Sequence, residues 1–267
     1  MIVLSEIWIY PVKSLPGIRQ TSAIIDRRGL EWDRHWMLVN PDGEFVSQRQ
    51  LPQMALFSVE LENNQLRLGF PEKTEFSIGL NECSGDQTKV KIWDDHVNAD
   101  LIGEEANLWF SDCLGVSVRL VKMPENEKRQ VDQLYAEPED QTGFSDGFPF
   151  LLFSQASLDD LNARIEDESQ QMSVARFRPN LVIDGVSAYA EDHWQVIKIG
   201  TTTFRVVKPC SRCAITTVDP ASGIKGSEPL RTLAKYRREG NKVFFGQNVI
   251  HDSAGVIHQG DLLSELA

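Results

Sequence analysis

The sequence predicts a β-rich α+β protein built from two parts. Many short segments are rich in β-branched and aromatic residues, turn-forming residues separate them, and only three stretches carry helix signals. A chain of 267 residues with 41% hydrophobic residues can bury one large core or two closely packed ones. We place the boundary between the two parts in the region 121–143 and predict domains of residues 1–121 and 122–267.

The first part is predicted to consist mainly of short strands. Turn signals such as the Pro-Asp-Gly sequence at 41–43 and the asparagine pair at 63–64 separate these strands. The spacing is typical of a sandwich or a barrel. Over residues 103–110 the pattern changes to that of a helix. The predicted strands are residues 2–10, 21–25, 35–39, 55–61 and 90–93.

The second part mixes strands with short helices. Residues 124–142 are polar and charged, which predicts a long surface connection or a lid. An apolar run follows at 148–153, after which Ser154 is predicted to cap a helix that extends through Ile165. Another short helix is predicted at 229–236, where a proline starts it. The predicted strands are residues 180–184, 194–199, 203–207 and 242–249.

The composition limits the possible partners and compartment. A formal net charge of −12 repels phosphate backbones and argues against nonspecific binding to nucleic acid or anionic membranes. The N-terminus lacks the features of a secretory signal, and no apolar run approaches the ~20 residues that span a bilayer. Four cysteines in a chain of this length do not form a disulfide framework. We therefore expect a cytoplasmic protein that binds neither nucleic acid nor membrane.

The Lys-Pro-Cys-Ser-Arg-Cys sequence at 208–213 carries the clearest chemical signal. Its two cysteines, Cys210 and Cys213, can chelate a metal, form a redox disulfide or present one reactive thiolate. A structural zinc site needs about four ligands, and no second cysteine or histidine pair accompanies this one. The charges of Lys208 and Arg212 favour a thiolate. From the residues alone, a zinc site, a redox dithiol, one functional thiolate and two inert cysteines all remain open.

Three further motifs place a cation beside a hydroxyl, an amide or a turn: Tyr-Pro-Val-Lys-Ser at 10–14, Asp-Arg-His-Trp at 33–36 and Arg-Phe-Arg-Pro-Asn at 176–180. Groups of this kind bind phosphate, because arginine offers a planar fork and lysine a point charge. Each motif taken singly is also explained by a solvated charge or a surface salt bridge. The Phe-Ser-Asp-Gly sequence at 144–147 predicts a turn capped by its aspartate.

Together these motifs resemble one known family. The runs KPCSRCAITTVDPASG, PLRTLAKYR and FGQN are similar to the core of a MOSC domain, and YPVKS and DRHWMLV resemble the β-barrel domain that precedes it. SDGFPFLLFSQASLDDLN and ARFRPNLVI complete the pattern in the right order, over nearly the whole chain. The similarity is closest to mitochondrial amidoxime reducing components and to bacterial proteins that detoxify hydroxylaminopurine. It implies a β-barrel-like N-terminal domain packed on a MOSC β-barrel domain.

The resemblance implies a molybdenum cofactor in its molybdopterin form, held in a pocket between the two domains. Cys213 matches the metal ligand of the family and, together with Asp146, is expected to be catalytic. Cys210 matches no ligand and is predicted to be a small packed residue of the turn. The sequence departs from some relatives at Gly147, where they have threonine. The cofactor-binding residues implied by the family motifs are Lys13, Ser14, Arg34, Ser145, Arg178, Asn180, Ser211, Arg212 and Cys213.

The implied activity is the reduction of small N-hydroxylated or N-oxidised compounds. Some bacterial relatives carry a ferredoxin domain after the MOSC domain, whereas this chain ends at residues 263–267 with no cluster-binding cysteines left over. We therefore expect a separate electron-transfer protein of the ferredoxin, flavoprotein or cytochrome type. One alternative is a sulfur-carrier or cofactor-handling protein similar to the C-terminal domain of molybdenum cofactor sulfurase. Another is a non-enzymatic zinc-binding or interaction module.

Overall fold

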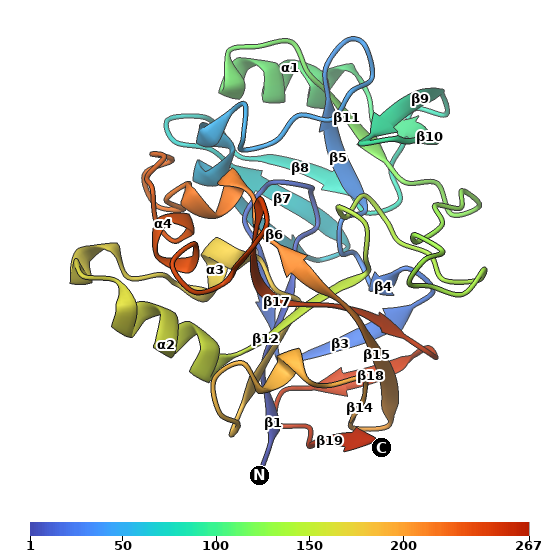
Figure 1. Cartoon of the computed structure of the whole chain (residues 1–267). Coiled ribbons are helices and arrows are strands. Elements are labelled where there is room, and N and C mark those ends of the chain that lie inside the picture. Colours follow the sequence, from blue (N-terminus) through green and yellow to red (C-terminus); the bar gives the residue numbers. More distant parts are fainter. Residues whose placement is uncertain (267) are drawn as a thin grey trace.

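The computed structural model describes residues 1–266; Ala267, which ends the predicted second domain, lies outside the described residues. Nineteen strands and four α-helices make up the described chain, which confirms the prediction of a β-rich α+β fold. Figure 1 shows helix α1 at one end of the molecule, and the start of β1 and strand β19 at the opposite end.

The largest sheet combines the beginning of the chain with its C-terminal half. Its order is β19-β14-β15-β17-β12-β13-β1-β2, and β16 pairs with β17. β1 is antiparallel to β13, and β12 is parallel to β13, so the first strand is hydrogen-bonded to a strand from the second half. The strands of this sheet are β1 (Val3–Ile9), β2 (Ile18–Gln20), β12 (Phe150–Ser154), β13 (Leu181–Asp184), β14 (Val196–Ile199), β15 (Thr202–Ser211), β16 (Arg238–Glu239), β17 (Lys242–His251) and β19 (Leu263–Leu266).

Three smaller sheets contain the remaining strands, most of them from the first half. One has the order β5-β11-β10-β9, one β18-β3-β4, and one β6-β7-β8. Their strands are β3 (Ser22–Asp26), β4 (Gly29–Leu30), β5 (Trp36–Val39), β6 (Ser58–Glu62), β7 (Gln65–Gly69), β8 (Phe76–Gly79), β9 (Gln87–Ile92), β10 (Asp95–Leu101), β11 (Arg119–Lys122) and β18 (Gly255–His258).

The helices are short and lie outside the sheets. The predicted cap is confirmed: the Ser154 side chain accepts a hydrogen bond from the amide of Ser157 at 3.2 Å. Helix α1 ends at Gly115, whose positive φ of 68° is the left-handed geometry that glycine adopts without strain. The helices are α1 (Glu104–Leu114), α2 (Gln155–Arg164), α3 (Val174–Phe177) and α4 (Leu230–Leu233), with 3-10 turns at Pro52–Leu56, Glu168–Gln170, Ala190–Asp192 and Ala214–Thr217.

The hydrophobic core follows the same organisation. One cluster of buried side chains comes entirely from residues 12–120, and Trp36 and Phe110 lie fully buried within it. A second cluster combines Ile7 of β1 with Phe150 and Phe204 from the large sheet. Because this cluster contains side chains from both halves of the chain, their burial stabilises the contact between the two halves. The division at residue 121 stays a prediction.

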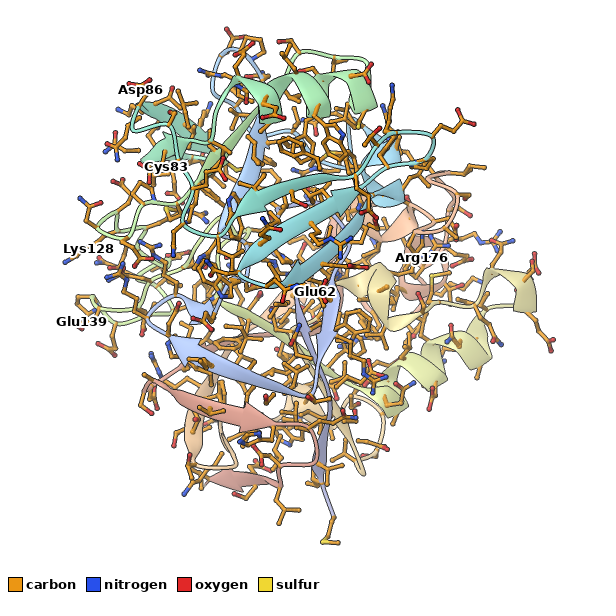
Figure 2. The ribbon with its side chains drawn as sticks, turned by 180° about the vertical axis from the view of Figure 1, so that it is seen from behind. Glu62, Cys83, Asp86, Lys128, Glu139 and Arg176 are labelled. Carbon is orange, nitrogen blue, oxygen red and sulfur yellow. The ribbon has the colours of Figure 1, made fainter. Side chains whose placement is uncertain are left out.

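Two local predictions need correction. Residues 55–61 were expected to form one strand, but the 3-10 turn Pro52–Leu56 comes first, with its proline at the start of the turn where a missing amide hydrogen costs little. The segment 124–142 was expected to lie on the surface. It contains no helix or strand, and Lys128 and Glu139 do point outward (Figure 2), but Arg129 and Val131 are buried. No helix among residues 1–266 is long and apolar enough to cross a membrane.

Candidate functional site

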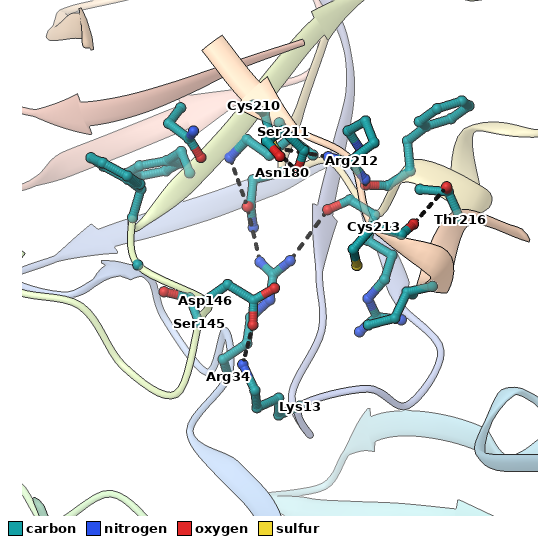
Figure 3. A pocket seen from close by; sticks show the side chains of 18 of the residues that line it. Lys13, Arg34, Ser145, Asp146, Asn180, Cys210, Ser211, Arg212, Cys213 and Thr216 are labelled. Atoms are coloured by element: carbon teal, nitrogen blue, oxygen red, sulfur yellow. Dashed lines mark hydrogen bonds and ion pairs between the residues drawn. The ribbon is translucent and has the colours of Figure 1, made fainter. Parts of the chain in front are cut away.

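One pocket brings together every side chain that the sequence predicted for the site. Its walls come from the segment after β1, the turn before β5, the loop before β12, the segment after α3 and the end of β15 (Figure 3). Both halves of the chain therefore contribute to it, as expected. The predicted residues that line it are Lys13, Ser14, Arg34, Ser145, Asp146, Arg178, Asn180, Ser211, Arg212 and Cys213.

Cys213 lies between the end of β15 and the 3-10 turn Ala214–Thr217. Its carbonyl oxygen accepts hydrogen bonds from the amide and the hydroxyl of Thr216, at 3.2 and 3.0 Å, which hold the backbone in place. The half-buried side chain points into the pocket (Figure 3). Its sulfur makes no hydrogen bond with any residue of the described chain, so it can serve a ligand.

Cys210 is not the packed turn residue that was predicted. Strand β15 continues through Ser211, and Pro209 is accommodated because it lies between two irregularities in the pairing with β17. Cys210 is half-buried and lines the same pocket as Cys213. Its sulfur accepts a hydrogen bond from Nη1 of Arg212 at 3.0 Å.

Lys13 and Asp146 form an ion pair in the pocket. The buried Lys13 ammonium donates to Asp146 Oδ1 at 2.5 Å and to the Phe144 carbonyl at 2.8 Å. Burial lowers the pKa of Lys13 to about 8, although Asp146 opposes this shift. The surrounding protein disfavours ionisation of Asp146, whose side chain nevertheless keeps 61% of its surface exposed. The Lys13 charge outweighs that effect and holds the pKa of Asp146 well below its usual value.

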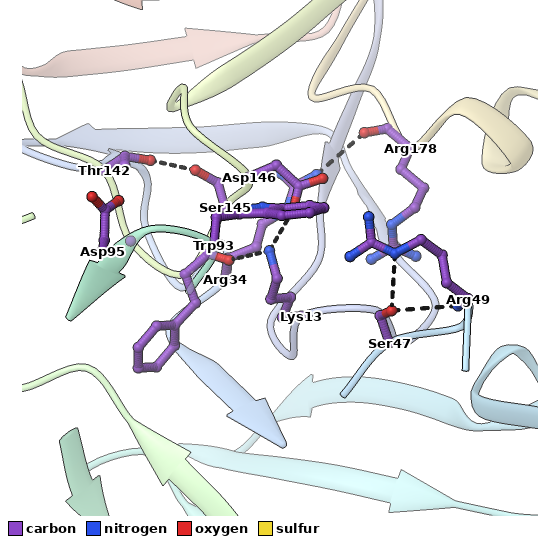
Figure 4. Close-up of polar contacts among 12 residues, drawn as sticks. Lys13, Arg34, Ser47, Arg49, Trp93, Asp95, Thr142, Ser145, Asp146 and Arg178 are labelled. Carbon is purple, nitrogen blue, oxygen red and sulfur yellow. Dashed lines mark hydrogen bonds and ion pairs between the residues drawn. The ribbon is translucent and has the colours of Figure 1, made fainter. Parts of the chain in front are cut away.

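Trp93, in the turn of the β9–β10 hairpin, contacts Asp146, and Arg49 lies against Trp93 (Figure 4). Nε1 of Trp93 donates to Asp146 Oδ1 at 3.3 Å. The Arg49 guanidinium lies over the Trp93 ring, with Cζ 4.2 Å from the ring centroid, and its Nε donates to Ser47 Oγ at 3.3 Å. Neither Trp93 nor Arg49 was predicted from the sequence, because a single exposed aromatic residue or arginine in a turn carries no chemical signal of its own.

Arg129 anchors the loop that carries Ser145 and Asp146. Its side chain is only 3% exposed and donates to the carbonyls of Gly143 at 2.9 Å, Ser145 at 2.6 Å and Asp146 at 3.3 Å. It also donates to Asp95 Oδ2 at 2.7 Å. A planar guanidinium can satisfy several acceptors at once, so this single residue fixes the position of the loop.

Arg34 is held by a network of buried polar groups. Its Nη1 donates to Asp33 Oδ2 at 2.5 Å and to Asn180 Oδ1 at 2.9 Å, and its Nη2 donates to the Arg178 carbonyl at 3.2 Å. Burial raises the pKa of Asp33, although the Arg34 charge opposes this shift. The Asn180 side-chain oxygen also accepts a hydrogen bond from the Leu151 amide, and its Nδ2 donates to the Trp8 carbonyl. Asn180 therefore orients Arg34 in addition to lining the pocket.

Arg178 and Arg212 keep hydrogen-bond donors that the described chain does not use. The Arg178 guanidinium makes no hydrogen bond or ion pair with residues 1–266 and lies over the Tyr10 ring. Burial lowers the pKa of Arg178 to about 10, which leaves it charged at neutral pH. Nη2 of Arg212 donates to the Phe177 carbonyl at 2.6 Å, but its Nε is buried without a partner. An anionic ligand would satisfy both groups.

The three predicted serines differ in their surroundings. Ser14 has a left-handed φ of 67°, and its carbonyl accepts a hydrogen bond from Gln48 Nε2 at 2.7 Å. The Ser145 hydroxyl is hydrogen-bonded to the Thr142 hydroxyl (Figure 4). The hydroxyls of Ser14 and of the exposed Ser211 have no hydrogen-bond partner within residues 1–266. These two hydroxyls are the ones available to a ligand.

The pocket does not offer a conventional metal cage. Nowhere in residues 1–266 do three or more histidine, cysteine, aspartate or glutamate side chains gather closely enough to hold a metal ion. A structural zinc site, which needs about four protein ligands, therefore has no matching set of side chains in the described chain. A metal bound by Cys213 would need its other ligands from a cofactor.

Comparison with known proteins agrees with this geometry. Residues 1–117 match the MOSC N-terminal beta barrel domain, and residues 139–264 match the MOSC domain. The chain belongs to the MOSC family. Mitochondrial amidoxime-reducing component 1 of Mus musculus is 34% identical over 276 residues, covering 97% of this chain and 80% of that protein. The Homo sapiens protein of the same name is 34% identical over 284 residues, covering 97% and 81%. Molybdenum cofactor sulfurase of Oryza sativa subsp. japonica is 32% identical over 91% of this chain but only 32% of its own length.

The MOSC pocket also contains residues that the sequence analysis did not select. Thr216 and Asn248 lie in the conspicuous TT and FGQN runs, whose composition specifies no chemistry, so the resemblance was the only signal for them. The lining also includes several apolar side chains. The additional lining residues are Gly147, Phe148, Phe150, Leu151, Phe177, Cys210, Ile215, Thr216 and Asn248.

Proposed function

We propose that this protein is a molybdenum cofactor-dependent reductase of N-hydroxylated or N-oxidised compounds, which takes its electrons from a separate donor protein in the cytoplasm. One observation carries the proposal. The sulfur of Cys213, which makes no hydrogen bond within residues 1–266, lines the same pocket as four cationic side chains. These cations are Lys13, Arg34, Arg178 and Arg212. The mitochondrial amidoxime-reducing components among the relatives supply the expected class of substrate.

The residues of the pocket fit a molybdopterin cofactor. The unpartnered guanidinium of Arg178 and the buried, unpaired Nε of Arg212 suit the phosphate of the pterin, since charge-assisted hydrogen bonds to phosphate are strong. Cys213 would hold the metal as a soft thiolate ligand. When bound, the cofactor would supply the two-electron redox chemistry of the reduction.

The protein's own side chains would bind the substrate and supply protons for the reaction. Conversion of an N–OH group to N–H consumes two electrons and two protons and releases one water molecule. Asp146 is ionised and exposed, so it can accept a hydrogen bond from the N–OH group of a substrate. Lys13 lies behind it and, with a pKa lowered to about 8, holds a proton at neutral pH that it can give up. Arg34 and Arg178 bind the cofactor and take no part in the chemistry.

The second candidate is a cofactor- or sulfur-handling protein without N-reductase turnover. It is supported by the similarity to molybdenum cofactor sulfurase. In that case Cys213 would carry or present a group and would not take part in repeated turnover. The two candidates share the pocket and differ only in the reaction.

Protein from a cofactor-competent host separates the candidates. We expect molybdenum and pterin in the purified protein, together with reduction of a simple aromatic amidoxime by chemically reduced methyl viologen. Molybdenum and pterin without turnover would favour the carrier. Protein without metal would contradict the reductase, and zinc in place of molybdenum would contradict both candidates. Arg178→Ala should lower pterin affinity about ten- to more than a hundredfold, because a charge-assisted phosphate contact contributes about 1.5–3 kcal/mol. Full pterin content with lost turnover would instead place Arg178 at the reacting centre.

A further inference from the structure

Tyr10 lies against two arginines of the pocket without lining it. Its side chain is 1% exposed, and the guanidinium carbons of Arg34 and Arg178 lie over its ring, 4.4 and 4.3 Å from the centroid. Arg34 also forms hydrogen bonds with other groups, whereas the Arg178 guanidinium lies over the ring and makes no hydrogen bond or ion pair within residues 1–266. The ring is thus placed to determine where Arg178 points.

The Tyr10 hydroxyl has no corresponding role. It is buried and has no hydrogen-bond partner in the described chain. The negative face of an aromatic ring attracts a cation, and the attraction is stronger where water is excluded, as it is here. The ring therefore favours the charged form of both arginines, whose Cζ atoms lie 4.4 and 4.3 Å from its centroid.

The surrounding backbone is built to hold this ring. The Tyr10 amide donates to Asp33 Oδ1 at 2.8 Å, and the other oxygen of the same carboxylate binds Arg34. A Cβ atom at Gly17 would lie 2.4 Å from Cε1 of Tyr10, so only glycine leaves room for the ring. One carboxylate thus fixes Tyr10 and Arg34 together, and a glycine keeps the space that the ring needs.

We propose that Tyr10 is a positioning residue for anion binding: its ring, and not its hydroxyl, holds the Arg178 guanidinium toward the pocket. The proposal rests on the proposed function in one respect, which is that the natural anion is the phosphate of the cofactor. It goes beyond that function because Tyr10 does not line the pocket and would act through Arg178.

The test compares two substitutions of Tyr10 with a matched control. Tyr10→Phe keeps the ring and Tyr10→Leu removes it. Phe110→Leu removes a fully buried aromatic ring from the cluster formed by residues 12–120. Each full-length protein is purified from a cofactor-competent host, and its pterin content is measured. Its cofactor-depleted form is then titrated with inorganic phosphate while Tm is followed.

We expect Tyr10→Leu to bind phosphate about tenfold more weakly, which corresponds to about 1.4 kcal/mol, and to lose most of its pterin. Tyr10→Phe and Phe110→Leu should keep wild-type phosphate affinity, although Phe110→Leu lowers Tm.

The outcomes separate this inference from the proposed function. Wild-type phosphate affinity and pterin content in Tyr10→Leu would overturn the role of the ring. A loss in Tyr10→Phe equal to that in Tyr10→Leu would assign the role to the hydroxyl and overturn the proposal as stated. Wild-type protein that holds pterin but reduces no amidoxime would overturn the proposed function and leave the role of Tyr10 standing. A phosphate titration without effect on the wild-type protein would contradict the anion site itself.

Discussion

Replacement of Arg129 by alanine should destabilise the protein and displace the loop that carries Asp146. The guanidinium is 3% exposed and donates four hydrogen bonds, three of them to carbonyls of residues 143, 145 and 146. Hydrogen bonds to a charged group contribute about 1.5–3 kcal/mol each, but such contributions do not add. The loss of the Asp95 partner also costs less, because the Asp95 carboxylate can turn toward solvent. A total loss of about 3–5 kcal/mol is typical when one partner of a buried charged network is removed.

For a chain of this size, that loss corresponds to a fall in Tm of about 10 °C. Thermal unfolding followed by circular dichroism measures it. The Tm of Arg129→Lys should fall between those of the wild type and Arg129→Ala, because one ammonium cannot reach three carbonyls. Arg67→Ala is the matched control, since Arg67 pairs with three carboxylates on the surface and its loss should leave Tm close to the wild-type value. A Tm of Arg129→Ala no lower than that of Arg67→Ala would refute the assignment of Arg129 as the anchor of the loop.

Two further substitutions test the electrostatics and the packing of the pocket. Asp146→Asn should move the pKa of Lys13 below about 8, because the carboxylate raises that pKa and burial alone would remain; an NMR titration of the lysine measures it, and an unchanged pKa would contradict the ion pair. Gly17→Ala should cost about 1–3 kcal/mol in urea unfolding, because the new methyl group overlaps the Tyr10 ring; wild-type stability would show that the ring is not confined there.

The strand-rich class was predictable because strand signals are local. Segments rich in β-branched and aromatic residues located β1 and β5 closely, and the hydroxyl of Ser154 located the start of α2. The extent of β15 was not predictable in the same way. Its last residues contain Pro209, a residue that normally ends a strand, and only the irregular pairing with β17 lets the strand continue.

The site was predictable from the family motifs and not from spacing. No local pattern shows that Lys13, Arg34 and Cys213 meet, since they lie on segments far apart in the chain. Arg129 was missed for a related reason: an arginine in a polar segment is normally solvated. Its burial depends on three carbonyls that converge only after folding.

The mechanism proposed here depends most on Cys213 acting as the single protein ligand of the metal. Molybdenum content and the rate of amidoxime reduction should therefore be measured together in Cys213→Ser and Cys210→Ala. Cys213→Ser replaces a soft thiolate by a hydroxyl, so turnover should collapse even where the pterin stays bound through its phosphate. Cys210→Ala should keep most of the metal and the rate, because Arg212 retains its bond to the Phe177 carbonyl. An equal and severe loss of molybdenum and of reduction rate in both variants would contradict the single-ligand mechanism. It would favour a mechanism in which Cys210 and Cys213 act together as a dithiol.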